Sequence, residues 1–275
     1  MPAGAIYDGR VFADVLRACA ARRRGTRLVV LSDFDGTLAE FDLDPTLPRI
    51  RSDAFAALVA LSSLSQVTLG LVSGRRVADL ARRVPLGSEV YMAGLHGLEI
   101  VVDDRHWRHD AVERALTAVL ALETSLAPVV AGTAGARLEP KGAAVAVHVR
   151  GVARDERAAV LAAADASAEP WLSAGALKLL VGADVHEYLP AAAWNKGDAV
   201  RWIAHDIERT TGETPWLVYF GDDLTDEDAF RAVGEGVSVV VGRRASAARY
   251  RLESTADVAA VLADLAEAVA LEGAR

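Results

Sequence analysis

Three short apolar runs, each followed at once by a polar turn, constrain the fold more than any other feature of this sequence. The runs are Leu28–Leu31, Val67–Val72 and Leu217–Phe220. A continuous apolar run of this length is typical of a strand that is buried on both faces, as in a parallel sheet. Helical stretches separate the runs, and this alternation predicts an α/β fold with a doubly wound parallel sheet.

The elements expected on this basis occupy the two ends of the chain. We expect strands at 27–33, 67–72, 89–93, 217–220 and 237–241, and helices at 10–23, 52–64, 74–84, 196–209, 226–233 and 256–271.

The middle of the chain has a different pattern. A helical stretch at 110–126 precedes two alternating segments near 137–150, and a helix at 154–166 precedes strands near 176–181 and 184–189. Helix, hairpin, helix and hairpin in this order predict a small α+β unit with an antiparallel sheet. We therefore expect a core domain at 1–102 and 190–275, interrupted by an α+β cap domain at 103–189.

Composition excludes several classes of partner. The 275 residues carry a formal net charge of -8, which disfavours nucleic acids and anionic membranes as partners. No apolar run reaches the roughly 18 residues of a membrane span, and no signal peptide is expected. The single cysteine, Cys19, excludes an internal disulfide framework and is compatible with a cytoplasmic location. The sequence leaves the oligomeric state open.

The first polar turn carries two carboxylates, Asp33 and Asp35. It follows a buried strand, where open α/β sheets place their ligands, and residues two apart in extended chain share a side. One carboxylate there can bind a hard cation and attack phosphorus, while the other donates or accepts a proton. An Asp-x-Asp pair at a strand end can also serve only as turn or cap.

Two further turns offer groups for an anion. Ser73-Gly74 follows the second apolar run, where Ser73 can cap the next helix and the helix N-terminus can face a phosphate. Lys196 opens a helix, which is unfavourable for the helix dipole and hints at an anionic partner. A plain N-cap and a solvated lysine are the alternatives.

The fourth turn is strongly acidic. Five carboxylates lie within the seven residues from Asp222 to Asp228. Some suit the start of a helix, but so many like charges repel one another unless a cation offsets them. Mg²⁺ prefers oxygen ligands and usually takes one or two carboxylates, so the segment predicts a magnesium site.

These four turns, in this order on an α/β frame, resemble the haloacid dehalogenase (HAD) superfamily of phosphatases. The resemblance implies an HAD-like, Rossmann-like core with Asp33 as nucleophile and Asp35 as general acid/base. It implies that Ser73, Gly74 and Lys196 hold the phosphoryl oxygens. Mg²⁺ would be bound by Asp33, by the Asp35 backbone carbonyl and by Asp222, with Asp226 supporting the site.

Other segments carry a narrower resemblance, to trehalose-6-phosphate phosphatases. They are Gly94–Glu99, Glu139–Gly142, His148–Arg150, the segment around Glu187, and Gly221–Phe230. The resemblance implies that six residues grip the sugar and close the cap: Arg75, His96, Glu139, Lys141, His148 and Glu187.

Each of these six has a plainer interpretation. His96 can shape a tight turn, His148 can lie on the polar face of a strand, and Glu139 with Lys141 can form a solvated pair. Glu187 shares a strand face with Val185 and Leu189, so the period of two could even bury it.

Two departures from the family pattern concern the substrate. Glu40-Phe41 stands where family members commonly have Pro-Ile, and Pro140 stands where Asn or Asp is frequent. The expected activity is hydrolysis of trehalose 6-phosphate through an aspartyl-phosphate. The alternatives are another glycosyl phosphate, such as a glucosylglycerol, mannosylglycerate or trehalose-like pseudodisaccharide phosphate, and a non-catalytic sugar-phosphate-binding protein.

Overall fold

The structure is a computed structural model that describes residues 10–20, 25–42, 44, 46–182 and 184–273. The chain divides into two compact units. The first unit contains residues 1–41, 47–106 and 194–275, and the second, which we call the inserted unit, contains residues 42–46 and 107–193. The short segment 42–46, which follows the first polar turn, belongs to the inserted unit, and this was not predicted.

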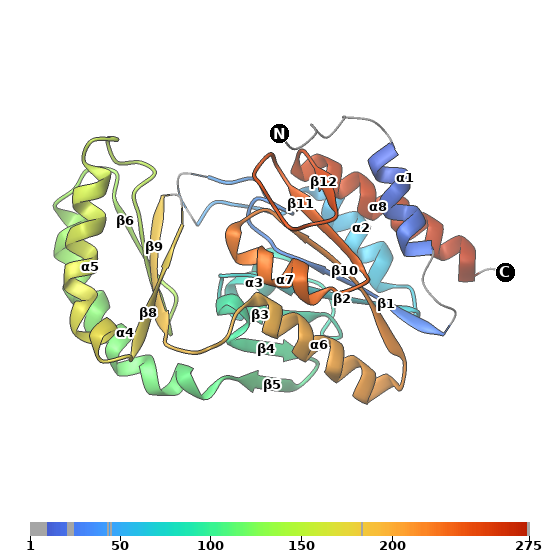
Figure 1. Ribbon diagram of the computed structural model, residues 1–275, viewed down its shortest axis with the longest axis horizontal. Helices are drawn as coiled ribbons and strands as arrows, with labels where there is room; N and C mark the ends of the chain where they lie inside the picture. Colours follow the sequence, from blue (N-terminus) through green and yellow to red (C-terminus); the bar gives the residue numbers. More distant parts are fainter. Residues whose placement is uncertain (1–9, 21–24, 43, 45, 183, 274–275) are drawn as a thin grey trace. The chain divides into compact units, whose positions relative to one another are not determined.

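An eight-stranded sheet forms the centre of the first unit (Figure 1). Its strands, in spatial order, are β12 (Tyr250–Leu252), β11 (Val237–Val241), β10 (Thr214–Gly221), β1 (Thr26–Ser32), β2 (Val67–Val72), β3 (Tyr91–Gly94), β4 (Glu99–Val102) and β5 (Arg105–Arg108). The six strands from β12 to β3 are parallel, whereas β4 pairs antiparallel with β3. The mostly parallel sheet confirms the predicted fold class.

Helices cover both faces of this sheet. They are α1 (Arg10–Ala20), α2 (Ser52–Ser62), α3 (Val77–Arg83), α6 (Lys196–Thr211), α7 (Glu227–Ala232) and α8 (Thr255–Gly273), with short 3₁₀ turns η1 (Leu95–Gly97) and η2 (Leu224–Asp226). Figure 1 shows α1, α2 and α8 grouped on one face and α6 beside α7 on the other. Alternate residues of β1, β2, β10 and β11 pack with α2 and α8 in one apolar cluster, which explains why these strands are apolar throughout.

The strand order places the ends of β1, β2 and β10 next to one another. β1 pairs with β2 on one side and with the distant β10 on the other, in parallel register from Thr26↔Thr214 to Ser32↔Phe220. In a doubly wound sheet this is the switch point, where polar groups at the carboxyl ends of the strands meet. The turns that begin at Asp33, Ser73 and Asp222 follow these three strands.

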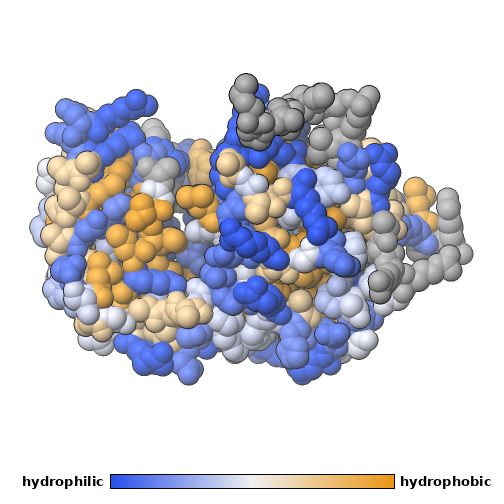
Figure 2. Space-filling model, viewed as in Figure 1, coloured by the Kyte–Doolittle hydropathy of each residue, from blue (hydrophilic) through white to orange (hydrophobic). Residues whose placement is uncertain are grey.

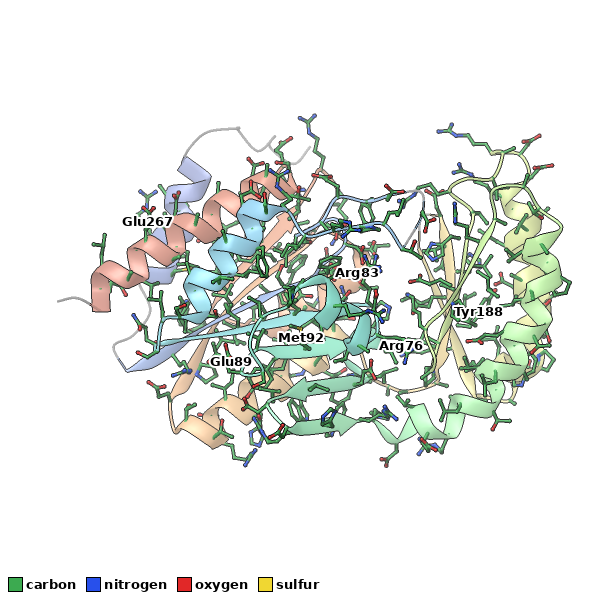
Figure 3. All side chains as sticks on the ribbon, turned by 180° about the vertical axis from the view of Figure 1, so that it is seen from behind. Arg76, Arg83, Glu89, Met92, Tyr188 and Glu267 are labelled. Carbon is green, nitrogen blue, oxygen red and sulfur yellow. The ribbon has the colours of Figure 1, made fainter. Side chains whose placement is uncertain are left out.

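The inserted unit is a four-stranded antiparallel sheet with two helices. The strands lie in the order β6 (Arg137–Pro140), β7 (Val145–His148), β9 (Val185–Pro190), β8 (Leu177–Val181), and the helices are α4 (Asp110–Ala131) and α5 (Arg157–Ser173). Both helices pack against one face of the sheet in a single apolar cluster that includes Tyr188, which Figure 3 labels on β9. The other face is left for the polar side chains of β6, β7 and β9.

Helix α4 is long and apolar enough to be considered as a membrane-spanning helix. It has 22 residues and a window of mean hydropathy 1.4, so by length and composition it is the one helix of the described residues that could cross a membrane. Its residues Val119, Leu122 and Leu126 are buried in the core of the inserted unit. A single helix of this kind is weak evidence for a membrane span.

Several sequence predictions need correction. Helix α3 begins at Val77 and not at Gly74, because the chain bends at Gly74 and Arg75 and the Arg76 backbone is extended, with φ -66 and ψ 147. Consequently, Ser73 does not cap this helix. Strands β4, β5 and β12 were not predicted, and the predicted end of the first helix, at 21–23, lies outside the described residues.

The surface of both units mixes hydrophilic and hydrophobic residues on the face drawn in Figure 2. The exposed large apolar side chains come from separate elements: Phe41, Leu47, Val59, Leu120, Val181, Leu224 and Leu271. Single exposed apolar residues of this kind are normal at a protein surface and do not by themselves mark an interface.

Candidate active site

Asp33 and Asp35 lie in a tight loop that leaves the end of β1. The Asp33 amide donates to the Phe220 carbonyl oxygen at 2.8 Å, which extends the pairing of β1 with β10 by one residue. The loop then folds back, and the Gly36 amide donates to the Ala39 carbonyl at 2.7 Å. Gly36 has φ +78, and a Cβ there would meet Asp222 Oδ2 at 2.3 Å. Only glycine therefore allows the loop to approach the acidic turn this closely.

Lys196 is the cation of the site. It is the first residue of α6, whose N-cap Asn195 and Asp198 form a capping box. Its Nζ lies 3.1 Å from Asp33 Oδ2 and 2.8 Å from Asp226 Oδ1, and all three side chains are buried. Burial alone would lower the pKa of Lys196, but the charges of Asp226 and Asp33 outweigh it and raise the pKa above its usual value. Lys196 is therefore a permanent positive charge against the Asp33 carboxylate.

Asp226 is fully engaged by the protein itself. Its Oδ1 accepts from Lys196 Nζ at 2.8 Å and from the Tyr219 hydroxyl at 2.7 Å. Its Oδ2 accepts the backbone amides of Asp222 and Asp223 at 3.1 and 3.0 Å. Four hydrogen bonds match the four acceptor positions of a carboxylate. Asp226 thus holds Lys196 and the acidic turn together, and the hydroxyl of Tyr219 is a site group that the apolar run around it concealed from sequence reasoning.

Asp33 and Asp222 have too little positive charge around them to offset the cost of burying their charged forms. Burial raises the pKa of Asp33 to about 7, with Lys196 opposing the shift and Asp226 adding to it. Burial, together with the charges of Asp33 and Asp226, raises the pKa of Asp222 to about 9. Carboxylate oxygens of Asp33, Asp222 and Asp226 all lie within 4.8 Å of one another. Asp33 and Asp222, whose charged forms are destabilised, are close-set oxygen donors that fit a hard divalent cation such as Mg²⁺.

Arg75 lies against Asp35. Its Nε and Nη2 donate to the two oxygens of Asp35, each at 2.7 Å, and its Nη1 donates to Asp79 at 2.9 Å. The guanidinium also stacks over the Phe34 ring, with its carbon 5.4 Å from the ring centroid. A bidentate arginine fixes a carboxylate in one plane. The structure therefore assigns to Arg75 a contact with Asp35 that the family resemblance, which implied a sugar contact, did not suggest.

The loop after β2 is built around backbone contacts. The Ser73 amide donates to the Ala93 carbonyl, its carbonyl accepts from the His96 amide, and both distances are 2.9 Å. A Cβ on Gly74 would lie 2.8 Å from the His96 ring, so the ring packs directly on this glycine. His96 itself has φ 58 and ψ 29, a left-handed conformation that is uncommon for a residue other than glycine. The structure therefore brings Ser73, Gly74 and His96 together.

The four polar residues predicted in the middle of the chain also come together, within the inserted unit. Glu139 on β6 and Glu187 on β9 both pair with Ala146 of β7, so their side chains lie on one face of the sheet. His148 Nε2 lies 2.8 Å from Glu139 Oε2, and Lys141 Nζ lies 3.0 Å from Glu187 Oε2.

Each glutamate of this second cluster has a basic side chain beside it. Burial would raise the pKa of Glu139, but His148 and Lys141 outweigh it and lower the pKa below its usual value. Glu187 is buried, as the strand period allowed, and it is paired with Lys141. The cluster contains hydrogen-bonding groups suited to a polar ligand.

Comparison with known proteins bears on the whole chain. The sequence model of the trehalose-phosphatase family matches residues 31–256. A trehalose-phosphate phosphatase of Mycobacterium marinum is 34% identical over 254 residues, which are 90% of this chain and 63% of that protein. A trehalose-phosphate phosphatase of Mycobacterium tuberculosis is 37% identical over 238 residues, covering 84% of this chain and 59% of its own length. The chain thus spans about 60% of the length of these two relatives.

Solved structures show the same fold. The C-terminal domain of Candida albicans trehalose-6-phosphate phosphatase has a TM-score of 0.77 at 22% identity, over 93% of this chain and 96% of that one. The crystal structure of a trehalose-6-phosphate phosphatase related protein also has a TM-score of 0.77, at 20% identity, over 89% and 99% of the two chains. Both cover about nine tenths of this chain.

Proposed function

This chain belongs to the trehalose-phosphatase family, and from that premise we propose that it hydrolyses trehalose 6-phosphate to trehalose and phosphate. The observation that carries the proposal is the buried contact of Lys196 with Asp33, at 3.1 Å. Asp35, two residues further along the chain, is bound by Arg75. A carboxylate beside a fixed cation can attack phosphorus while the cation offsets the charge of the phosphoryl oxygens.

The first half-reaction forms an aspartyl-phosphate. An Asp33 carboxylate oxygen attacks phosphorus in line with the bond to the sugar oxygen, and that bond breaks. Asp35 donates a proton to the departing sugar oxygen, so trehalose leaves as the neutral alcohol. Because the Arg75 fork occupies both oxygens of Asp35 in this structure, Asp35 is proposed to carry the proton once the fork has opened.

The second half-reaction returns the enzyme to its initial state. Asp35 takes a proton from a water molecule whose oxygen attacks phosphorus, and the bond between phosphorus and Asp33 breaks. Phosphate leaves, and Asp33 is again a carboxylate beside Lys196. Ser73 and Gly74, in the loop after β2, are proposed to contact the phosphoryl oxygens with Lys196.

Magnesium is the proposed cofactor. The Asp33 carboxylate, the Asp35 backbone carbonyl and Asp222 would hold it, and Asp226 would support the site through the contacts that keep Lys196 and the acidic turn in place. When bound, the ion supplies positive charge that stabilises the transferring phosphoryl group.

The inserted unit is proposed to be a cap that recognises the sugar. Glu139, Lys141, His148 and Glu187 would bind sugar hydroxyls, because carboxylates, an ammonium and an imidazole together offer both acceptors and donors. His96 is proposed as a further sugar contact, and Arg75 as one only if its fork on Asp35 opens. A sugar-phosphate substrate and a single buried cysteine, Cys19, fit the cytoplasmic location that we propose.

The deciding experiment is phosphate release from trehalose 6-phosphate, set against a panel of other sugar phosphates, with and without Mg²⁺. We expect trehalose 6-phosphate to give the highest kcat/KM and chelator to stop release. Faster hydrolysis of a different glycosyl phosphate would overturn the proposed substrate and leave the phosphatase chemistry in place. No release from any ester would overturn both.

A further inference from the structure

The acidic turn carries five carboxylates, and the structure gives each a different environment. Asp222 and Asp226 belong to the active site. The Asp223 side chain accepts the backbone amide of Asp226 in a capping box at the start of η2. Asp228 lies on the surface against Arg231 at 2.9 Å. Glu227 is the residue that the proposed chemistry leaves unexplained.

Glu227 is held by an arginine from a distant part of the sequence. Arg244, in the connection between β11 and β12, places Nη1 2.6 Å from Glu227 Oε1. The other oxygen of Glu227 accepts the Ala247 amide at 2.9 Å, so the same connection is attached to Glu227 twice. Both charged side chains are largely shielded from solvent, at 23% and 13% exposure, which makes their pairing stronger than that of a fully exposed pair.

The rest of the Arg244 guanidinium binds the backbone of the acidic turn. Nε donates to the Asp222 carbonyl oxygen and Nη2 to the Asp223 carbonyl oxygen, each at 2.5 Å. One planar group thus spans two consecutive peptide carbonyls beside the Asp222 carboxylate. The amides of the same two residues are bound by Asp226 from the other direction. The backbone of Asp222 and Asp223 is therefore fixed on both its donor and its acceptor sides.

We infer that Arg244 is a positioning residue for the metal site: with Glu227 it fixes the backbone of the acidic turn so that the Asp222 carboxylate faces Asp33. The inference rests on the proposed magnesium requirement. Groups that orient metal ligands without touching the ion commonly change metal affinity by roughly 10- to 100-fold when they are removed.

Charge and geometry predict opposite effects for the loss of Arg244. Removing a positive charge near Asp222 makes the site more negative, which by itself would tighten cation binding. Removing the fork frees two backbone carbonyls and lets the turn move, which would weaken binding. The geometric effect is the one inferred here, and Arg244→Lys separates the two because it keeps the charge and loses the planar fork.

The test is Mg²⁺ binding to the full chain, measured by isothermal titration calorimetry without substrate. We expect Arg244→Ala and Arg244→Lys each to raise the Mg²⁺ dissociation constant by roughly tenfold. The matched control is Arg243→Ala, since Arg243 is the neighbouring residue, is 83% exposed and pairs only with Glu253 among the ion pairs of the described residues. That variant should bind Mg²⁺ within about twofold of the parent.

A second variant keeps the test valid if an Arg244 substitution fails to fold. Glu227→Gln retains size and should weaken Mg²⁺ binding in the same direction, by a smaller factor. Mg²⁺ affinity of Arg244→Lys equal to or tighter than that of the parent would overturn the inference and leave the proposed function standing. Failure of the parent to bind Mg²⁺ would instead overturn the metal requirement, and the inference with it.

Discussion

The two units each hold a cluster of charged side chains, and the clusters differ in their balance of charge. In the first unit one cation, Lys196, lies among three aspartates, and the pKa values of Asp33 and Asp222 are raised to about 7 and about 9. In the inserted unit two glutamates face Lys141 and His148, and the pKa of Glu139 is lowered. In the first cluster two carboxylates have raised pKa values, whereas in the second each glutamate has a basic side chain beside it.

This difference separates two tasks. A site that stabilises a transferring phosphoryl group gains from unsatisfied carboxylates that bind a cation and from a nucleophile held against a lysine. A site that recognises sugar hydroxyls gains from groups that are already oriented and can exchange one hydrogen-bond partner for another.

The largest effect should come from the nucleophile in the first cluster. Asp33→Asn keeps the size of the side chain but removes the attacking carboxylate, so we expect kcat to fall by at least about 10⁴-fold. Circular dichroism should show an unchanged fold. Mass spectrometry of a trapped intermediate should find the phosphoryl group on the peptide that contains Asp33, and its location on any other residue would contradict the mechanism.

Metal removal should affect the first cluster as a whole. Chelation is expected to abolish activity and added Mg²⁺ to restore it, because the pKa values of Asp33 and Asp222 stay raised, at about 7 and about 9, with Lys196 in place. Asp222→Ala should reduce activity at saturating Mg²⁺ by roughly 10²-fold or more. Asp228→Ala is the matched control, since Asp228 pairs with Arg231 at the surface, and it should change activity less than about twofold. Full activity in excess chelator would contradict the contrast between the two clusters.

The second cluster should respond to the substrate and not to the metal. Glu139→Ala or Glu187→Ala should lower kcat/KM for trehalose 6-phosphate by about tenfold or more, since a lost buried hydrogen bond costs about 1–3 kcal/mol. Part of the loss can fall on kcat, because binding energy from the sugar can assist the chemical step. Hydrolysis of p-nitrophenyl phosphate, which lacks the sugar, should change much less.

The comparison of two substrates also provides the control. A misfolded variant would lose both activities, and thermal melting identifies it. Equal losses on both substrates in a variant of normal stability would mean that the inserted unit does not recognise the sugar. The loss of neither activity would mean that these glutamates are not substrate contacts.

The smallest effect should come from Asp79, a carboxylate that is surrounded by more positive than negative charge. Burial would raise the pKa of Asp79, but hydrogen bonds from Arg83, Arg75 and Arg82 outweigh it and lower the pKa to about 2. Figure 3 labels Arg83 on α3, which also carries Asp79. Because the folded pKa lies below the unfolded value of 3.8, Asp79 contributes stability above about pH 4, and this contribution is lost as the pH falls towards 2.

Urea unfolding at several pH values measures this contribution. Partial exposure of Asp79 screens its ion pairs, so we expect it to account for only about 1 kcal/mol of the change in unfolding free energy between pH 4 and 2. Asp79→Asn should flatten the pH dependence over that interval and leave it unchanged above pH 5. An identical pH dependence in the parent and the variant would show that the three arginines do not stabilise the charged form.

The fold class and the acidic residues at the strand ends could be predicted from the sequence. Runs such as Leu28–Leu31 and Leu217–Phe220 are typical of strands in a sheet covered on both faces, and parallel strands bring their carboxyl ends to one edge. The pairing of β1 with β10 then places Asp33 close to Asp222. Lys196 could also be identified as a candidate from the sequence, because a lysine at a helix start opposes the helix dipole.

The partners of these residues were decided only by the tertiary structure. No local pattern links Arg75 to Asp35, or Arg244 to the carbonyls of Asp222 and Asp223. The partners in each contact are far apart in the sequence, and they meet only when the sheet has formed. The late start of α3 was also not predicted. Its first amide, that of Val77, donates to Glu99 from a later strand and not to Ser73. Local pattern fixes which residues stand at a strand end. Only packing decides which charge each one faces, because Coulomb energies depend on distances that are set across the sheet.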